Sequence, residues 1–141
     1  MIEHEYRFRV TYAETDKMGI VHHSNYVKYY EVARWELFRS LGVSYHSIEE
    51  AGYMVPVINM NLRFIKTAHY DDLLTVRTRL KAIRGARMWV TYLLYNEQLE
   101  LINEAETELA FVRSDSWKPC GTPSFVKEVI ERCSRTEQEY A

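Results

Sequence analysis

Residues 12–34, YAETDKMGIVHHSNYVKYYEVAR, form the stretch that decides the fold, because a loop passes here into a long helical pattern. Ser24 or Asn25 offers a cap for the helix N-terminus. Beyond this cap, apolar residues recur at helical spacing as far as Leu41, and Gly42 supplies a C-terminal stop. The pattern therefore predicts one long helix, which its broad apolar stripe should bury along much of its length.

Five other segments carry strand patterns, because they alternate between apolar and polar residues or are apolar on both faces. They are residues 5–12, 58–64, 74–81, 88–95 and 99–111. Shorter helices are expected over 45–51 and 123–132. One long helix against a five-stranded, largely antiparallel sheet is an α+β architecture. Since no linker or repeat interrupts residues 1–141, we expect a single domain.

Two features of the strand segments concern their packing. The basic face formed by Arg77, Arg79 and Lys81 can pair with the acidic face of residues 99–111 across the sheet. Residues 88–95 are apolar on both faces, which indicates a central strand or an interface. Because one helix covers only part of such a sheet, we expect a second subunit to bury the remainder.

The composition of the 141-residue chain excludes several classes of protein. With 18 basic and 20 acidic residues, the net charge of −2 gives no basic footprint for nonspecific nucleic-acid binding. No apolar run is long enough for a membrane span, and the charged N-terminus is unlike a signal peptide. Cys120 and Cys133 lack metal or redox spacing, so a reduced, cytoplasmic protein is expected.

Asp16 is the first candidate for chemistry, because it lies in the loop just before the buried helix. A carboxylate near a helix start and aromatic residues can act as a general base or as a nucleophile. The N–H groups of the helix start can polarise a carbonyl or hold an oxyanion. An aspartate in a loop can equally serve only to cap a turn, so the residue alone leaves both interpretations open.

The remaining candidates carry weaker signals. Tyr12 could line a pocket or hydrogen-bond to Asp16. His22 and His23 are adjacent and point in different directions, so we expect no metal site. Glu31 and Arg34 have the spacing of a structural ion pair on the helix. Several basic residues could hold a phosphate or simply be surface charges: Arg63, Lys66, Arg84, Arg87 and Lys118.

The sequence resembles the hotdog-fold acyl-CoA thioesterases of the 4-hydroxybenzoyl-CoA thioesterase-like group, in the branch associated with the Tol–Pal system. The resemblance is carried by the motif Tyr12-x-x-x-Asp16-x-x-Gly19-Ile20-Val21-x-His23-Ser24-Asn25-Tyr26, followed by Tyr30-Glu31-x-Ala33-Arg34. It departs at His22, where many relatives have tyrosine, and at Thr67, where proline is usual. These departures concern the loop shape and the acyl preference, not the catalytic aspartate.

The resemblance implies a hotdog fold, in which the sheet wraps around the long helix, and a homodimer or homotetramer with active sites at the dimer interface. It implies that Asp16 is the catalytic carboxylate and that His23 and Tyr12 belong to the active site. Residues of the helix start and nearby aromatic residues are then expected to bind the substrate: Ser24, Asn25, Tyr26, Tyr30 and Tyr53. Another hotdog group has a catalytic glutamate on the helix, but the presence of Asp16 leaves Glu31 with a structural role.

The expected reaction is hydrolysis of a small or medium acyl-CoA to the free acid and CoA, with no cofactor, since CoA is part of the substrate. An acyl-carrier-protein thioesterase and a noncatalytic acyl-CoA-binding protein are the alternatives. A hotdog dehydratase would need a proline-containing motif after its histidine, which His23-Ser24-Asn25 lacks. An acyl-CoA sensor would usually carry a DNA-binding module, for which 141 residues leave no room.

Overall fold

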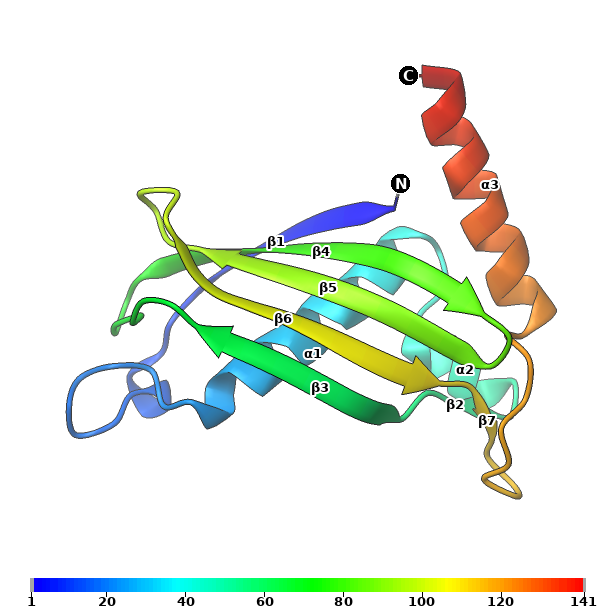
Figure 1. Cartoon of the computed structure of the whole chain (residues 1–141), viewed down its shortest axis with the longest axis horizontal. Coiled ribbons are helices and arrows are strands. Elements are labelled where there is room, and N and C mark those ends of the chain that lie inside the picture. Colours follow the sequence, from blue (N-terminus) through cyan, green and yellow to red (C-terminus); the bar gives the residue numbers. More distant parts are fainter. Residues whose placement is uncertain (1, 141) are drawn as a thin grey trace.

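A computed structural model describes residues 2–140 and shows a mixed α+β protein (Figure 1). Its elements in chain order are β1 (Glu3–Arg9), the 3₁₀ turn η1 (Tyr12–Glu14), α1 (Ser24–Ser40), α2 (Tyr45–Glu50), β2 (Tyr53–Met54), β3 (Val57–Phe64), β4 (Leu73–Arg84), β5 (Arg87–Tyr95), β6 (Leu101–Ala110), β7 (Val112–Arg113) and α3 (Ser124–Tyr140).

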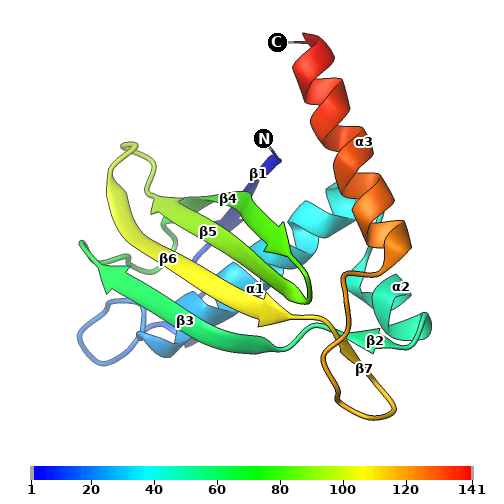
Figure 2. The ribbon, with the colours of Figure 1, turned by 45° about the vertical axis from the view of Figure 1, so that its right-hand side comes forward.

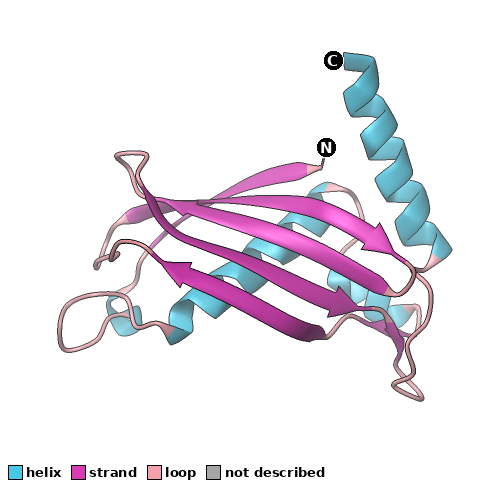
Figure 3. Ribbon diagram, viewed as in Figure 1, coloured by secondary structure: helices cyan, strands magenta, loops and turns pink. Residues whose placement is uncertain are grey.

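The main sheet has five strands in the order β1-β4-β5-β6-β3, and every neighbouring pair is antiparallel (Figure 3). The predicted five-stranded antiparallel sheet is therefore confirmed, with β5 in its centre. A separate two-stranded sheet pairs β2 with β7. This small sheet was not predicted, because a two-residue strand is too short to show a period.

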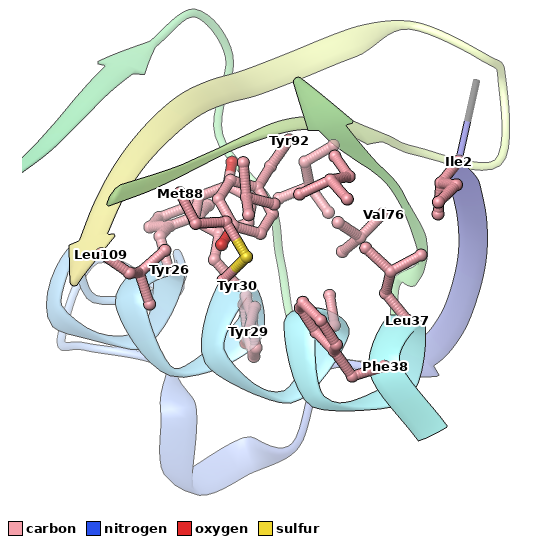
Figure 4. Close-up of a cluster of buried hydrophobic side chains, with 14 of the residues drawn as sticks. Ile2, Tyr26, Tyr29, Tyr30, Leu37, Phe38, Val76, Met88, Tyr92 and Leu109 are labelled. Atoms are coloured by element: carbon pink, nitrogen blue, oxygen red, sulfur yellow. The ribbon is translucent and has the colours of Figure 1, made fainter. Parts of the chain in front are cut away.

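Helix α1 lies across one face of the main sheet, and the core fills the space between them (Figures 1 and 4). Tyr30 and Leu37 of α1 are fully buried, as are Val76 of β4 and Met88 and Tyr92 of β5. Alternate residues of β5 are buried on this inner face. The period-2 pattern of the strands and the helical period of α1 thus bury their apolar residues against each other.

The ends of two predicted elements differ from the expectation. Strand β1 ends at Arg9, so Tyr12 belongs to the 3₁₀ turn and not to the strand. Helix α1 starts at Ser24 with His23 as its N-cap residue, and no side chain caps it. The expectation that Ser24 or Asn25 caps the helix was therefore wrong, since both residues are already helical.

The expectation of one long helix was incomplete, because α3 has 17 residues, the same length as α1. Phe125, Val126, Val129 and Ile130 recur at helical spacing and pack against the core at the start of α3. The helix then projects away from the sheet, beside the C-terminal end of α1 (Figures 1 and 2). Within residues 2–140, no helix has the length and apolar character needed to cross a membrane.

Arg34 is buried and does not form the predicted pair with Glu31. Only 5% of its surface is exposed, because it lies on the sheet-facing side of α1. Its Nε donates to the Tyr45 hydroxyl at 3.0 Å, and its Nη1 donates to the Tyr92 hydroxyl at 2.9 Å. The Tyr92 hydroxyl also hydrogen-bonds to the Thr107 hydroxyl at 2.9 Å. Burial raises the pKa of Tyr45 to about 12, although Arg34 acts in the opposite direction, so this phenol stays protonated at neutral pH.

The outer face of the sheet carries charges that pair within the chain. Lys81 reaches Glu106 across the intervening strand β5, with 2.8 Å between Nζ and Oε1, as predicted for the two faces. Arg77 and Arg79 instead pair with Glu5 and Glu3 of β1, because β1 is the neighbour of β4 on its other side.

Candidate active site

A pocket of about 350 Å³ lies where the loop after η1 meets the start of α1 and the end of β3. Its walls are Asp16, Ile20, Val21, His23, Tyr26, Phe64, Ile65, Lys66 and Thr67. A larger hollow of about 540 Å³ lies on the outer face of the sheet, among the ion-paired residues described above. The smaller pocket combines apolar walls with a carboxylate and an imidazole, so it is the better candidate for chemistry.

The loop that carries Asp16 is a small hairpin. The Asp16 N–H donates to the Ile20 carbonyl at 2.9 Å, and the Gly19 N–H donates to the Asp16 carbonyl at 3.0 Å. Gly19 has a φ of +78°, a conformation that glycine adopts without steric cost. The Val21 N–H donates to the Ala68 carbonyl at 2.8 Å, which joins the hairpin to the segment between β3 and β4. The backbone therefore fixes the place of Asp16.

The two oxygens of the half-buried Asp16 carboxylate differ in their hydrogen bonding. Its Oδ1 accepts a hydrogen bond from the Met18 N–H at 2.8 Å, so the predicted turn-capping role is real. Among the side chains that the structure describes, those of residues 2–134, and the backbone of residues 2–140, Oδ2 has no hydrogen-bond partner. One carboxylate thus holds the turn and still has an oxygen with which to accept a proton or attack a carbonyl.

The start of α1 offers fewer donors than the sequence suggested. The N–H of Asn25 donates to the His22 carbonyl at 2.9 Å, and that of Tyr26 makes a long bond of 3.4 Å to the His23 carbonyl. The Ser24 N–H lies 3.3 Å from His22 Nδ1. In the described part of the chain, the N–H of His23 has no acceptor. This N–H lies at the positive end of α1, and its residue lines the pocket, so it is available to polarise a carbonyl.

The structure brings three of the predicted site residues together, since Asp16, His23 and Tyr26 all line the pocket. The Tyr26 ring meets the Phe64 ring edge to face, with 5.4 Å between the centroids. Burial raises the pKa of Tyr26, so its phenol is protonated at neutral pH. This pair closes the pocket with aromatic surface.

The other predicted residues lie outside this pocket within the single chain. Tyr12 is 77% exposed and contacts Tyr70 edge to face. Tyr30 is fully buried and donates to Asn103 Oδ1. Tyr53 lies in β2, near the opposite end of α1 from the Asp16 loop (Figure 1). Their assignment to the active site stays a prediction.

Ser24 and Asn25 also have partners outside the pocket. The Ser24 hydroxyl hydrogen-bonds to His22 Nδ1 at 2.9 Å. The Asn25 side-chain amide donates to the Glu14 carbonyl at 2.8 Å. Both side chains therefore organise the start of α1, and the substrate-binding role assigned to them stays a prediction.

Sequence reasoning named Lys66 as a possible phosphate ligand and Thr67 as a departure that concerns the acyl preference. It missed that residues 64–67 together form a wall of this pocket at the end of β3. The N–H groups of Ile65 and Lys66 both approach the Ile102 carbonyl at 3.0 Å, so the chain bends here beside β6. A signal was present, because the consecutive apolar residues Phe64 and Ile65 break the alternation of β3. No group of three histidine, cysteine or acidic side chains among the described residues could hold a metal ion.

Comparison with known proteins gives concordant matches. The Thioesterase-like superfamily matches residues 10–130. YneP of Bacillus subtilis (strain 168) is 37% identical over 110 residues, which cover 78% of this chain and 80% of that protein. The acyl-CoA thioester hydrolase YbgC of Escherichia coli O6:H1 is 31% identical over 118 residues, which cover 84% of this chain and 88% of that protein. The structure of a DHNA-CoA thioesterase from Staphylococcus aureus aligns with a TM-score of 0.90 at 30% identity, covering 100% of this chain and 97% of that one.

Proposed function

This chain belongs to the Thioesterase-like superfamily, and from that premise we propose that it is an acyl-CoA thioesterase with Asp16 as its catalytic carboxylate. The observation that carries the assignment of Asp16 is that its Oδ2, in a pocket with apolar walls at the start of α1, has no hydrogen-bond partner in the described part of the chain. The substrate is the thioester of a small or medium acyl group, and the products are the free acid and CoA.

In the proposed mechanism, the His23 N–H and the dipole of α1 polarise the thioester carbonyl. Asp16 then takes a proton from a water molecule, whose oxygen attacks the acyl carbon while the C–S bond breaks and CoA leaves with the proton. In a second route, Asp16 itself attacks the acyl carbon, CoA leaves, and water hydrolyses the resulting anhydride. Both routes place a carboxylate oxygen in the same position and require no cofactor beyond the CoA of the substrate.

The apolar walls of the pocket are suited to the acyl group. Ile20, Val21 and Ile65 offer aliphatic surface, and the Tyr26–Phe64 pair offers aromatic surface. Lys66 is the cation at the rim, and it forms an ion pair with Glu100. A CoA phosphate that reaches Lys66 would compete with this carboxylate.

The proposal includes a hotdog fold in one domain over residues 1–141, because α1 lies against one face of the antiparallel sheet (Figure 1). It also includes a cytoplasmic location. The two cysteines are free, as is usual in a reducing compartment.

We further propose that two copies pair through the β3 edges of their sheets. The exposed side chains of β1, at the other edge, are all charged, namely Glu3, Glu5, Arg7 and Arg9. Strand β3 also exposes Asn59, Asn61 and Arg63, but Val57, Ile58, Phe64 and Ile65 at its two ends are each at least 39% exposed. An edge with exposed apolar side chains is better suited to pairing with another strand than one whose exposed side chains are all charged. Because Phe64 and Ile65 also line the pocket, a partner at this edge would close the site.

Placing a charge on the β3 edge by Ile58→Lys is expected to convert a dimer into a monomer of 16.8 kDa. Light scattering behind a sizing column measures the mass. Arg7→Glu, which reverses a charge on the β1 edge, should leave the dimer intact. A wild-type mass of 16.8 kDa, or the loss of the dimer in Arg7→Glu alone, would contradict pairing through β3.

The activity itself is tested by thiol release from a panel of short, medium, long and aromatic acyl-CoAs. We expect release from at least one small or medium acyl-CoA, with water as the only other reactant. The same acyl groups on an acyl carrier protein form the comparison series. Faster release from the carrier protein would identify it as the substrate, and binding without release from any thioester would show a noncatalytic protein.

A further inference from the structure

Glu14 is a buried acid that lies outside the pocket. It is 8% exposed, and Arg34 is the other charged side chain of the described region that is buried to this extent. Burying a carboxylate is costly unless hydrogen bonds or an opposite charge compensate it. The partners of Glu14 therefore indicate what its charge does.

The Glu14 side chain joins the turn η1 to helix α1. Its Oε1 accepts a hydrogen bond from the Thr11 N–H at 2.8 Å. Its Oε2 forms an ion pair with Nζ of Lys28, which lies in α1. Burial alone would raise the pKa of Glu14, but the hydrogen bonds from Lys28 and Thr11 outweigh it and lower the pKa below its ordinary value. The group is thus a carboxylate at neutral pH, as the ion pair requires.

The Glu14 backbone closes the base of the hairpin that carries Asp16. Its carbonyl accepts one hydrogen bond from the His22 N–H at 2.9 Å and another from the Asn25 side-chain amide at 2.8 Å. The Glu14 carbonyl thus ties the first strand of the hairpin to His22 in the second strand and to Asn25 in the first turn of α1. These are the parts of the chain that set the position of Asp16 relative to the His23 N–H.

The geometry points to Glu14 as a positioning residue for Asp16, an inference that rests on the proposed thioesterase function. Thr15 between them is extended, with φ −97° and ψ 155°. Because one residue separates Glu14 from Asp16 and the Glu14–Lys28 pair holds η1 against α1, loss of this pair frees the base of the hairpin that carries Asp16. Because the reaction needs Asp16 and the polarising N–H in register, small displacements lower the rate of the chemical step.

The test begins with Glu14→Gln, which keeps the size of the side chain and an acceptor for the Thr11 N–H but removes the charge that holds Lys28. We expect kcat to fall by roughly tenfold while KM stays within about twofold, because the substrate contacts remain. Lys28→Met should give the same loss, and the double variant should lose little more, since each change breaks the same pair. Glu5→Gln, which breaks the exposed ion pair with Arg77 on the outer sheet face, is the matched control and should leave kcat unchanged.

A double-mutant cycle with Asp16→Asn separates positioning from a general loss of structure. If Glu14 acts through Asp16, Glu14→Gln should change the residual rate of the Asp16→Asn enzyme by less than about twofold. An equal tenfold loss in both backgrounds, a wild-type kcat in Glu14→Gln and Lys28→Met, or a rise in KM alone would overturn the inference. The proposed function fails on a different observation, namely a wild-type enzyme that releases no thiol from any acyl-CoA.

Discussion

Asp16→Asn is expected to lower kcat for thioester hydrolysis by about 10²- to 10⁴-fold, the range found when a general acid or base is removed. Asparagine keeps a side-chain oxygen that can accept the Met18 N–H, so the turn should survive the change. It cannot accept a proton from water at neutral pH, and its amide is a poor nucleophile. The loss should therefore fall on kcat, with the melting temperature close to that of the wild type.

The matched control for this prediction is Asp115→Asn. Asp115 is an exposed aspartate that follows β7, and its Oδ1 lies 3.9 Å from Arg113 Nε. It is far from the pocket along the sheet, so its removal should leave kcat unchanged. If Asp16→Asn turns over acyl-CoA as fast as the wild type, Asp16 has no catalytic role, whatever the activity of the protein.

The same site allows the two proposed routes to be separated. During turnover in heavy-oxygen water, an anhydride intermediate can leave the label in the Asp16 carboxylate, because water can attack either carbonyl of the anhydride. A general base never exchanges its own oxygens. Label in the peptide that contains Asp16, measured by mass spectrometry, would therefore identify Asp16 as the nucleophile.

Arg34→Ala is expected to lower the free energy of unfolding by about 3 kcal/mol, because it opens a cavity in the core and removes a donor from the buried Tyr92 and the partly buried Tyr45. The Tyr45 hydroxyl loses the Arg34 Nε bond, whereas the Tyr92 hydroxyl keeps Thr107 as a partner. Urea unfolding followed by circular dichroism measures the change. Tyr45→Phe in the Arg34→Ala background should recover part of the loss, because it removes the unpaired hydroxyl.

Arg39→Ala is the control on the same helix. Arg39 is exposed and pairs with Glu36, so its removal should change the stability by no more than about 0.5 kcal/mol. Equal effects of the two substitutions would show that the contacts of Arg34 contribute no more than a surface ion pair does.

Much of the fold followed from local periodicity. The spacing of Tyr26, Tyr30, Ala33 and Leu37 predicted α1. Alternation predicted four strands of the main sheet, and a segment apolar on both faces predicted β5. The contacts of Arg34 could not be predicted in this way, because its partners lie in other elements, Tyr45 in α2 and Tyr92 in β5, and local periodicity does not show how elements pack. The extent of α3 was underestimated because polar residues fill its second half, where no apolar period continues.

The candidate site was predictable to a similar degree. A loop aspartate before a helix start identified Asp16, and the motif placed His23 and Tyr26 beside it. The wall formed by residues 64–67 depends on how β3 passes the Asp16 hairpin, which is a property of the tertiary structure. The contacts of Glu14 were also out of reach, because a carboxylate in a polar loop has the sequence signature of a surface residue.

The difference between the two edges of the sheet also limits how many copies of the chain can add to it. A sheet with two open edges can add neighbours without end and lead to fibres, whereas a sheet with one open edge can add one neighbour only. The charged side chains of β1 disfavour pairing at one edge, and a two-fold dimer would cover the other edge at β3. The same arrangement that would complete a site between two copies would therefore also protect the protein against polymerisation.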